Sequence, residues 1–112
     1  MANAFKVKTF DGSATGASTP MTIYTCPAST QTTIIGMSLA NIGTSQCTVD
    51  VTLENNDGDN VYIVKGVPIP VGSSFVPVGG DQKIVMEESD VIKVTCDTAN
   101  SVDTVLSVLE IS

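Results

Sequence analysis

Short apolar runs alternate with turn signals across the second half of the chain, from Asn60 to Thr95. The turn signals recur about every 8 to 12 residues, as they do in small β-sandwiches. They include single glycines and the clusters Gly79-Gly80-Asp81 and Glu87-Glu88-Ser89-Asp90. The pattern predicts an all-β fold: a single-domain antiparallel β-sandwich, jelly-roll or Greek-key-like, with eight or nine short strands.

Alternating or extended runs outline the individual strands. In the clearest of them, Cys47, Val49 and the next two alternate positions are apolar, while the residues between them are polar. The tyrosines and phenylalanines number only five, so Val, Ile and Leu must fill the core, which again favours strands. The expected strands are Ala4–Phe10, Met21–Cys26, Gln31–Asn41, Gln46–Glu54, Val61–Lys65, Phe75–Val78, Gln82–Met86, Val91–Cys96 and Thr104–Ile111.

The chain has the length of one domain, and we assign residues 1–112 to a single β-sandwich. The segment 11–20, DGSATGASTP, has almost no large side chains. Because such a segment buries little apolar area, we expect it to be a flexible loop or an arm that becomes ordered only on assembly.

The charge balance bears on the possible partners. Twelve acidic residues face five lysines, no histidine is present, and the net charge is −7. This charge repels nucleic-acid phosphates, so we expect no nucleic-acid binding. The lysines are scattered and no apolar run approaches a membrane span, so we expect no membrane association.

The cysteines Cys26, Cys47 and Cys96 show no C-x-x-C spacing. Cys47 and Cys96 continue apolar strand faces, which predicts buried free thiols that act as small hydrophobic residues. The first ten residues lack the apolar core of a signal peptide. We therefore expect folding in a reducing cytoplasm.

Two acidic clusters are candidate sites of chemistry. Glu87, Glu88 and Asp90 could in principle act as acid–base catalysts, but clustered acidic residues in a turn are more commonly a solvated surface. The Asp57-Gly58-Asp59 stretch offers oxygen ligands for Ca²⁺, but a hairpin turn is the commoner role for such a stretch. Without histidine or a G-x-S-x-G motif, we expect no catalytic residues, no cofactor and no metal.

Interaction surfaces remain as candidates. Within Gln31–Asn41, alternation puts Ile35, Met37 and Leu39 on one face and Ile34 with three small residues on the other. The second candidate surface is the apolar, proline-rich segment Val67–Val78, although its Phe and Val could instead close one end of the sandwich. The predicted interface residues are Gly36, Ser38, Ala40, Pro68, Ile69, Pro70, Phe75 and Val76.

A sugar-binding surface is a further alternative. Such sites usually place an exposed aromatic ring under the sugar. This sequence has no tryptophan, so Tyr24 and Tyr62 are the plausible platforms.

The run VKGVPIPVGSSFVPVGGDQKIVMEESDVIKV and the closing VLSVLEIS resemble small structural proteins of tailed, marine-type bacteriophages. The resemblance covers roughly Thr32 to Ser112 and is one of turns and strands. It implies a virion protein, in particular a capsid decoration or cement protein that stabilises the mature head by bridging subunits of the major capsid protein.

The same resemblance implies a homotrimer on the outer surface of the capsid, made in the host cytoplasm. Two alternatives stay open: a tail, neck or fibre component of the virion, and a glycan-binding adhesin module.

Overall fold

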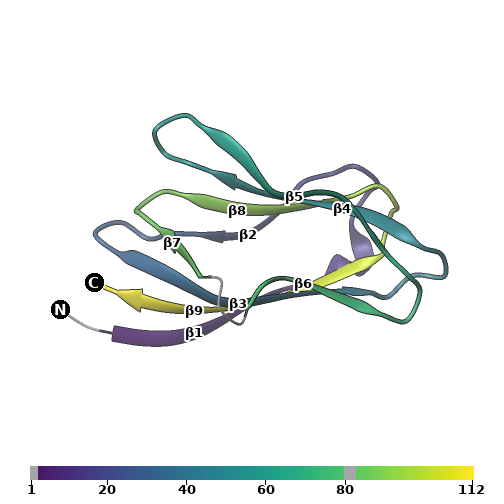
Figure 1. The fold of residues 1–112 in the computed structure, drawn as a ribbon, viewed down its shortest axis with the longest axis horizontal. Coiled ribbons are helices and arrows are strands. Elements are labelled where there is room, and N and C mark those ends of the chain that lie inside the picture. Colours follow the sequence, from purple (N-terminus) through teal and green to yellow (C-terminus); the bar gives the residue numbers. More distant parts are fainter. Residues whose placement is uncertain (1–2, 80–82) are drawn as a thin grey trace.

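The structure is a computed structural model, and it describes residues 3–79 and 83–112. Two antiparallel sheets pack face to face, as the two layers of Figure 1 show. The predicted all-β sandwich is therefore confirmed. The elements are β1 (Asn3–Phe10), η1 (Gly12–Ala14), β2 (Met21–Thr25), β3 (Gln31–Asn41), β4 (Cys47–Glu54), β5 (Asn60–Ile69), β6 (Ser74–Val78), β7 (Ile84–Met86), β8 (Val91–Cys96) and β9 (Val102–Ile111).

The strand order identifies the topology. One sheet runs β1-β9-β3-β6, with β7 also paired to β3, and the other runs β2-β8-β4-β5. Strands β6 and β7 pair with successive stretches of β3, so together they form one interrupted edge. Counting β6 and β7 as one edge strand, the two sheets have four strands each. This strand order, with the chain crossing between the sheets, is that of a jelly roll. The predicted turn Gly79-Gly80-Asp81 falls largely on residues 80–82, which lie outside the described residues.

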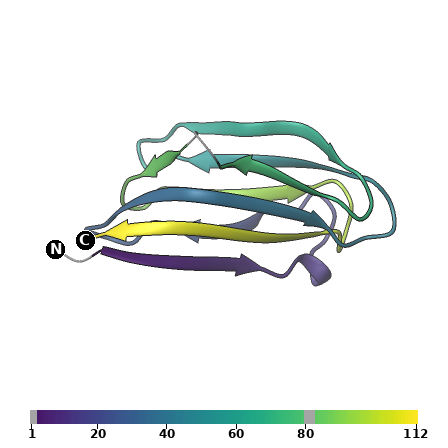
Figure 2. The same ribbon diagram turned by 60° about the horizontal axis from the view of Figure 1, so that its bottom comes forward.

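The termini lie together at one end of the sandwich, because Asn3 pairs with Ile111 across β1 and β9 (Figure 2). Within residues 3–79 and 83–112, no helix is long and apolar enough to cross a membrane.

The core is filled by the inner faces of both sheets, as the alternating pattern predicts. Each large aliphatic side chain buried there contributes roughly 1.5–3 kcal/mol. The most completely buried include Ile34, Leu39, Ile69, Met86, Ile92 and Leu106.

A β-bulge corrects the predicted alternation in β3. Ile34 is fully buried, and Ile35 is only partly buried. The pairing of β3 with β9 shifts register between Ile34 and Gly36, which inserts one extra residue. Assigning Ile35 to the face of Met37 was wrong because a one-residue shift exchanges the two faces of a strand.

The segment 11–20, expected to be a flexible loop or an arm that becomes ordered on assembly, makes hydrogen bonds to the rest of the domain. Gly12 is buried and its amide donates to the Asp103 carboxylate. The backbone amide of Ser18 donates to the carbonyl of Cys96, and the backbone amide of Asn100 donates to the carbonyl of Thr15. These contacts are made by backbone groups of the segment, which its side-chain composition does not reveal.

Candidate interaction surface

The outer face of the five-stranded sheet is unusually apolar. Paired residues in adjacent strands point to the same side of a sheet, so the register defines this face. Its exposed large side chains are Phe5 (79%), Val85 (64%), Val7 (62%), Val76 (59%) and Val105 (44%). We call these five residues, together with Gly36, Ser38 and Ala40, the apolar face. Among the outward strand positions that the structure describes in this sheet, the one charged residue is Asp103, at the end of β9.

Small side chains occupy the middle of the apolar face. Ser38 lies opposite Val105, and Gly36 lies opposite Ser107, in the neighbouring strand β9. A Cβ added at Gly36 would approach only the carbonyl oxygen of Val78, at 3.8 Å. Strand β3 is therefore low along Gly36, Ser38 and Ala40, with taller side chains on either side of it, such as Val105 on β9 and Val76 on β6. The small residues predicted from the sequence do share this face, and their role as an interface stays a prediction.

Strand β1 carries Phe5 and Val7 outward and its two lysines inward. Phe5 and Val7 face solvent, whereas Lys6 and Lys8 point over the seam between the two sheets. Lys6 Nζ lies 3.0 Å from a carboxylate oxygen of Glu110. The lysines therefore have partners on the inner side, and this leaves the outer side of β1 without charge.

The proline-rich segment does not form one patch. Ile69 is a core residue with 1% exposure, because it pairs inward with Cys47, and so it cannot line a surface. Phe75 also turns inward and packs against the core. Pro68 and Pro70 are exposed along the edge of the other sheet, and only Val76 reaches the apolar face.

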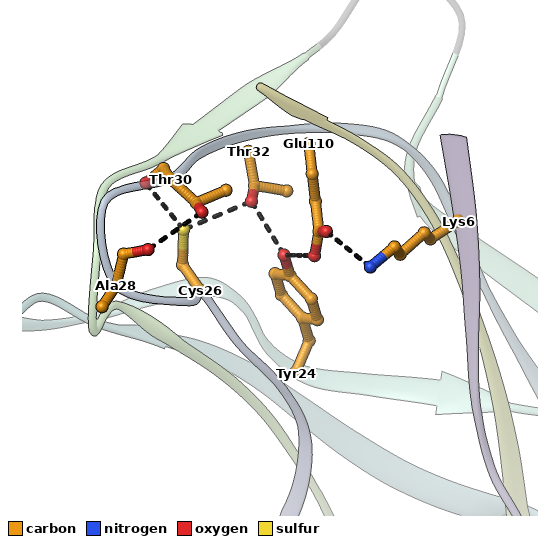
Figure 3. Close-up of polar contacts among 7 residues, drawn as sticks. All are labelled: Lys6, Tyr24, Cys26, Ala28, Thr30, Thr32 and Glu110. Atoms are coloured by element: carbon orange, nitrogen blue, oxygen red, sulfur yellow. Dashed lines mark hydrogen bonds and ion pairs between the residues drawn. The ribbon is translucent and has the colours of Figure 1, made fainter. Parts of the chain in front are cut away.

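A buried polar chain joins the two sheets near the chain termini (Figure 3). The Tyr24 hydroxyl donates to Glu110 and lies 2.8 Å from the Thr32 hydroxyl. The Cys26 thiol lies 3.2 Å from the same Thr32 hydroxyl. The chain thus links strands β1, β2, β3 and β9, which contribute Lys6, Tyr24, Thr32 and Glu110 in that order. Cys26 lies in the turn after β2.

Ionisation within this chain follows from its contacts. The hydrogen bond from Tyr24, followed by that from Lys6, lowers the pKa of Glu110 below its ordinary value. Burial, with a further contribution from the Glu110 hydrogen bond, raises the pKa of Tyr24. Glu110 is therefore held as a carboxylate and Tyr24 as a neutral phenol, which is the pairing that the hydrogen bond requires.

This geometry bears on sugar binding. Tyr24 is 5% exposed, so it cannot serve as an aromatic platform. Tyr62 is exposed, and Lys65 Nζ lies 4.9 Å from the centre of its ring. Only one of the two predicted platforms is thus on the surface.

The acidic turns come together, which the sequence did not predict. Asp90 is buried and accepts hydrogen bonds from the backbone amides of Asn56 and Glu87. A hollow of about 130 Å³ beside them is lined by Asn55, Asn56, Asp57, Glu87, Glu88 and Asp90. The part of the chain that the structure describes contains no group of three or more Cys, Asp or Glu side chains placed to hold a metal ion.

All three cysteines are free and buried, as predicted for Cys47 and Cys96. Burial raises the pKa of the Cys47 thiol to about 12 and raises that of Cys26 as well. Neither thiol is activated as a nucleophile at neutral pH, because the thiolate is the reactive form.

Comparisons with known proteins bear on the fold. No protein-family model matches the chain, and no curated protein matches it. A solved structure from Bacillus endospore appendages, described as a novel family of disulfide-linked pili, is similar with a TM-score of 0.53. The match has 15% sequence identity and covers 97% of this chain and 84% of that chain. At this identity the likeness shows a shared fold alone.

Proposed function

We propose that this chain is a structural protein of a tailed bacteriophage, a capsid decoration protein that binds the major capsid protein through its apolar face. The phage assignment is supported by the resemblance of residues 32–112 to such proteins. The contact surface is supported by the apolar face itself, which is the observation that carries the proposal.

Size and chemistry favour a protein contact for this face. Four strands about 4.8 Å apart, each about eight residues long, cover an area on the order of 500 Å². That area is the whole outer face of the sheet, on which exposed apolar side chains alternate with small and polar ones, and exposed apolar clusters on soluble proteins commonly mark interaction sites. The low line of small residues along β3 could receive a ridge of side chains from another protein, and apolar contact is strongest where such surfaces fit closely.

The proposed mechanism is mechanical. A decoration protein that contacts two neighbouring capsid subunits binds only where the assembled shell places them side by side. A protein that binds the assembled shell and not the separate subunits stabilises the assembled shell by mass action. The expanded head would gain stability in this way without any chemical step.

The test is to locate the protein in purified particles by electron microscopy. We expect density on the outer capsid surface, with the apolar face turned toward the shell. Particles that lack the protein should lose their genome at lower temperature while they still adsorb to cells. Density at the tail or neck, or stable particles that fail to adsorb, would contradict the decoration role and favour the tail or adhesin alternatives.

A further inference from the structure

The four edges of the two sheets differ in how they are protected. Edge strand β5 contains Pro68 and a left-handed Gly66, with φ +69°. Edge strand β2 has only five residues and a register shift between Thr22 and Tyr24. The β6/β7 edge is interrupted and contains Pro77. Prolines, bulges and short strands are the devices that keep a sheet edge from pairing with another chain.

Strand β1 has none of these interruptions. Its eight residues pair one for one with β9, from Asn3 opposite Ile111 to Phe10 opposite Thr104, without a register shift. No glycine, proline or positive φ angle occurs within it. The free side of β1 therefore presents a regular row of backbone donors and acceptors, which is a template for another strand.

The lysines of β1 decide which strand can pair there. Inward-pointing charges at an edge commonly discourage pairing. Lys6, however, already has Glu110 as its partner, and Lys8 lies about 6 Å from the centre of the Tyr24 ring. Their charge is thus partly engaged, and a second strand is excluded only where it places another lysine directly opposite.

A second copy of the same strand can avoid that clash. With the two sheet faces continuous and a two-fold axis at Val7, Lys6 would lie opposite Lys8 of the second copy. With the axis at Lys6, the two Lys6 side chains would oppose each other. With the axis at Phe5, the two phenylalanines pair and Lys6 lies opposite Ala4, so like charges are not directly opposed.

We propose that two copies of this chain associate through antiparallel pairing of their β1 strands, with Phe5 opposite Phe5 on the two-fold axis. The pairing covers Phe5, the most exposed of the large apolar side chains in the described chain. It brings together edges that contain no acidic residue, although each copy carries a net charge of −7. The two apolar faces become one surface that spans both copies.

A cysteine at the axis tests this pairing directly. Directly opposed residues of antiparallel strands have Cα atoms about 4.5–5.5 Å apart, within the range of a disulfide. The native thiols are 1% to 4% exposed and give little background. Under mild oxidation, the Phe5→Cys variant should form a covalent dimer at least ten times faster than matched variants at other exposed positions.

Two matched variants report on position and register. Val85→Cys is on the same face with similar exposure, but it lies on β7, at the opposite edge of the sheet from β1. Val7→Cys is on β1 itself, but in the proposed register it faces Asn3 of the second copy. Both should cross-link slowly. Fast cross-linking at Val7→Cys, or equal rates at positions 5 and 85, would overturn the proposed pairing.

The unmodified protein supplies the second measurement, because Phe5→Cys itself removes an apolar contact. Sedimentation should show a monomer–dimer equilibrium, and hydrogen exchange at β1 amides should slow as protein concentration rises. A monomer up to millimolar concentration overturns the inference. So does a trimer without concentration-dependent protection of β1, which would instead agree with the trimer implied by the sequence resemblance.

Discussion

The outer faces of the two sheets have opposite character, although the inner faces of both are apolar. The outer face of the β2-β8-β4-β5 sheet carries threonines, Asp50 and an ion pair between Lys93 and Glu54, at 3.0 Å, beside Tyr62 and Pro68 of the edge strand β5. The outer face of the other sheet carries Val105, Val7 and the rest of the apolar face. One face is built to meet water, and the other has the composition of a contact surface.

Strand propensity does not explain this difference. Threonine is β-branched like valine and stabilises a strand equally well on a solvated face. At Thr52 and Thr95 the chain uses threonine on the charged side. At Val85 and Val105 it uses valine at exposed positions, where threonine would form the same strands. The valines therefore favour a role in contact with another molecule.

The largest expected effect comes from placing a charge on the apolar face. Val105→Asp should weaken binding to depleted particles by about 30-fold, because an unpaired carboxylate in an apolar contact costs about 2 kcal/mol or more. Binding can be measured by co-sedimentation with the particles. The melting temperature should change little, because Val105 is 44% exposed.

The matched control is Thr52→Asp on the other outer face, where the new carboxylate lies opposite Lys93. This variant should bind particles as the unmodified protein does. Equal losses for the two variants would mean that the two faces do not differ in function.

A smaller effect is expected from the polar chain that joins the two sheets. The folded-state pKa of Glu110 is lowered, so its stabilising contribution is present above the ordinary carboxyl pKa and is lost as pH falls through the folded-state value. Glu110→Gln should lower the free energy of unfolding at pH 7 by about 1–2 kcal/mol. The difference from the unmodified protein should shrink below about pH 4.

Urea titrations monitored by circular dichroism at several pH values would measure this. Lys6→Met is a useful companion, since it removes one contact to Glu110 and leaves the Tyr24 hydrogen bond in place, and because the Lys6 side chain is about half exposed it should cost less. A Glu110→Gln deficit that is constant from pH 3 to pH 8 would show that the ionised carboxylate is not what stabilises the junction.

The smallest effect should follow from Lys93→Met on the charged outer face. Its ion pair with Glu54 is partly exposed, and such pairs contribute about 0–1 kcal/mol. We expect a loss of less than about 1 kcal/mol in chemical denaturation and unchanged particle binding. If this variant bound particles poorly, the contact surface would lie on the outer face of the β2-β8-β4-β5 sheet and not on the apolar face.

The local pattern of the sequence was sufficient for the sandwich and for most strands, although β5 continues through Gly66 and Pro68 to Ile69 where a strand was expected only as far as Lys65. Alternation from Cys47 to Leu53 and the recurring turn residues express a two-residue period that any half-buried strand must have. The bulge at Ile34 and Gly36 could not be read in this way, because it depends on how β3 aligns with β9, about seventy residues away. Likewise, burial of Ile69 follows from its pairing with Cys47.

The sequence by itself determined the fold class, the buried thiols of Cys47 and Cys96, and the placement of Gly36, Ser38 and Ala40 on one strand face, since each depends on neighbours along the chain. Only the tertiary structure decided that Phe5 and Val7 share a face with Val105 and that Ile69 does not. Which side of a strand meets water depends on the sheet it joins and on the partner strand's register. Contacts between residues far apart in the chain fix both, and a local pattern does not contain them.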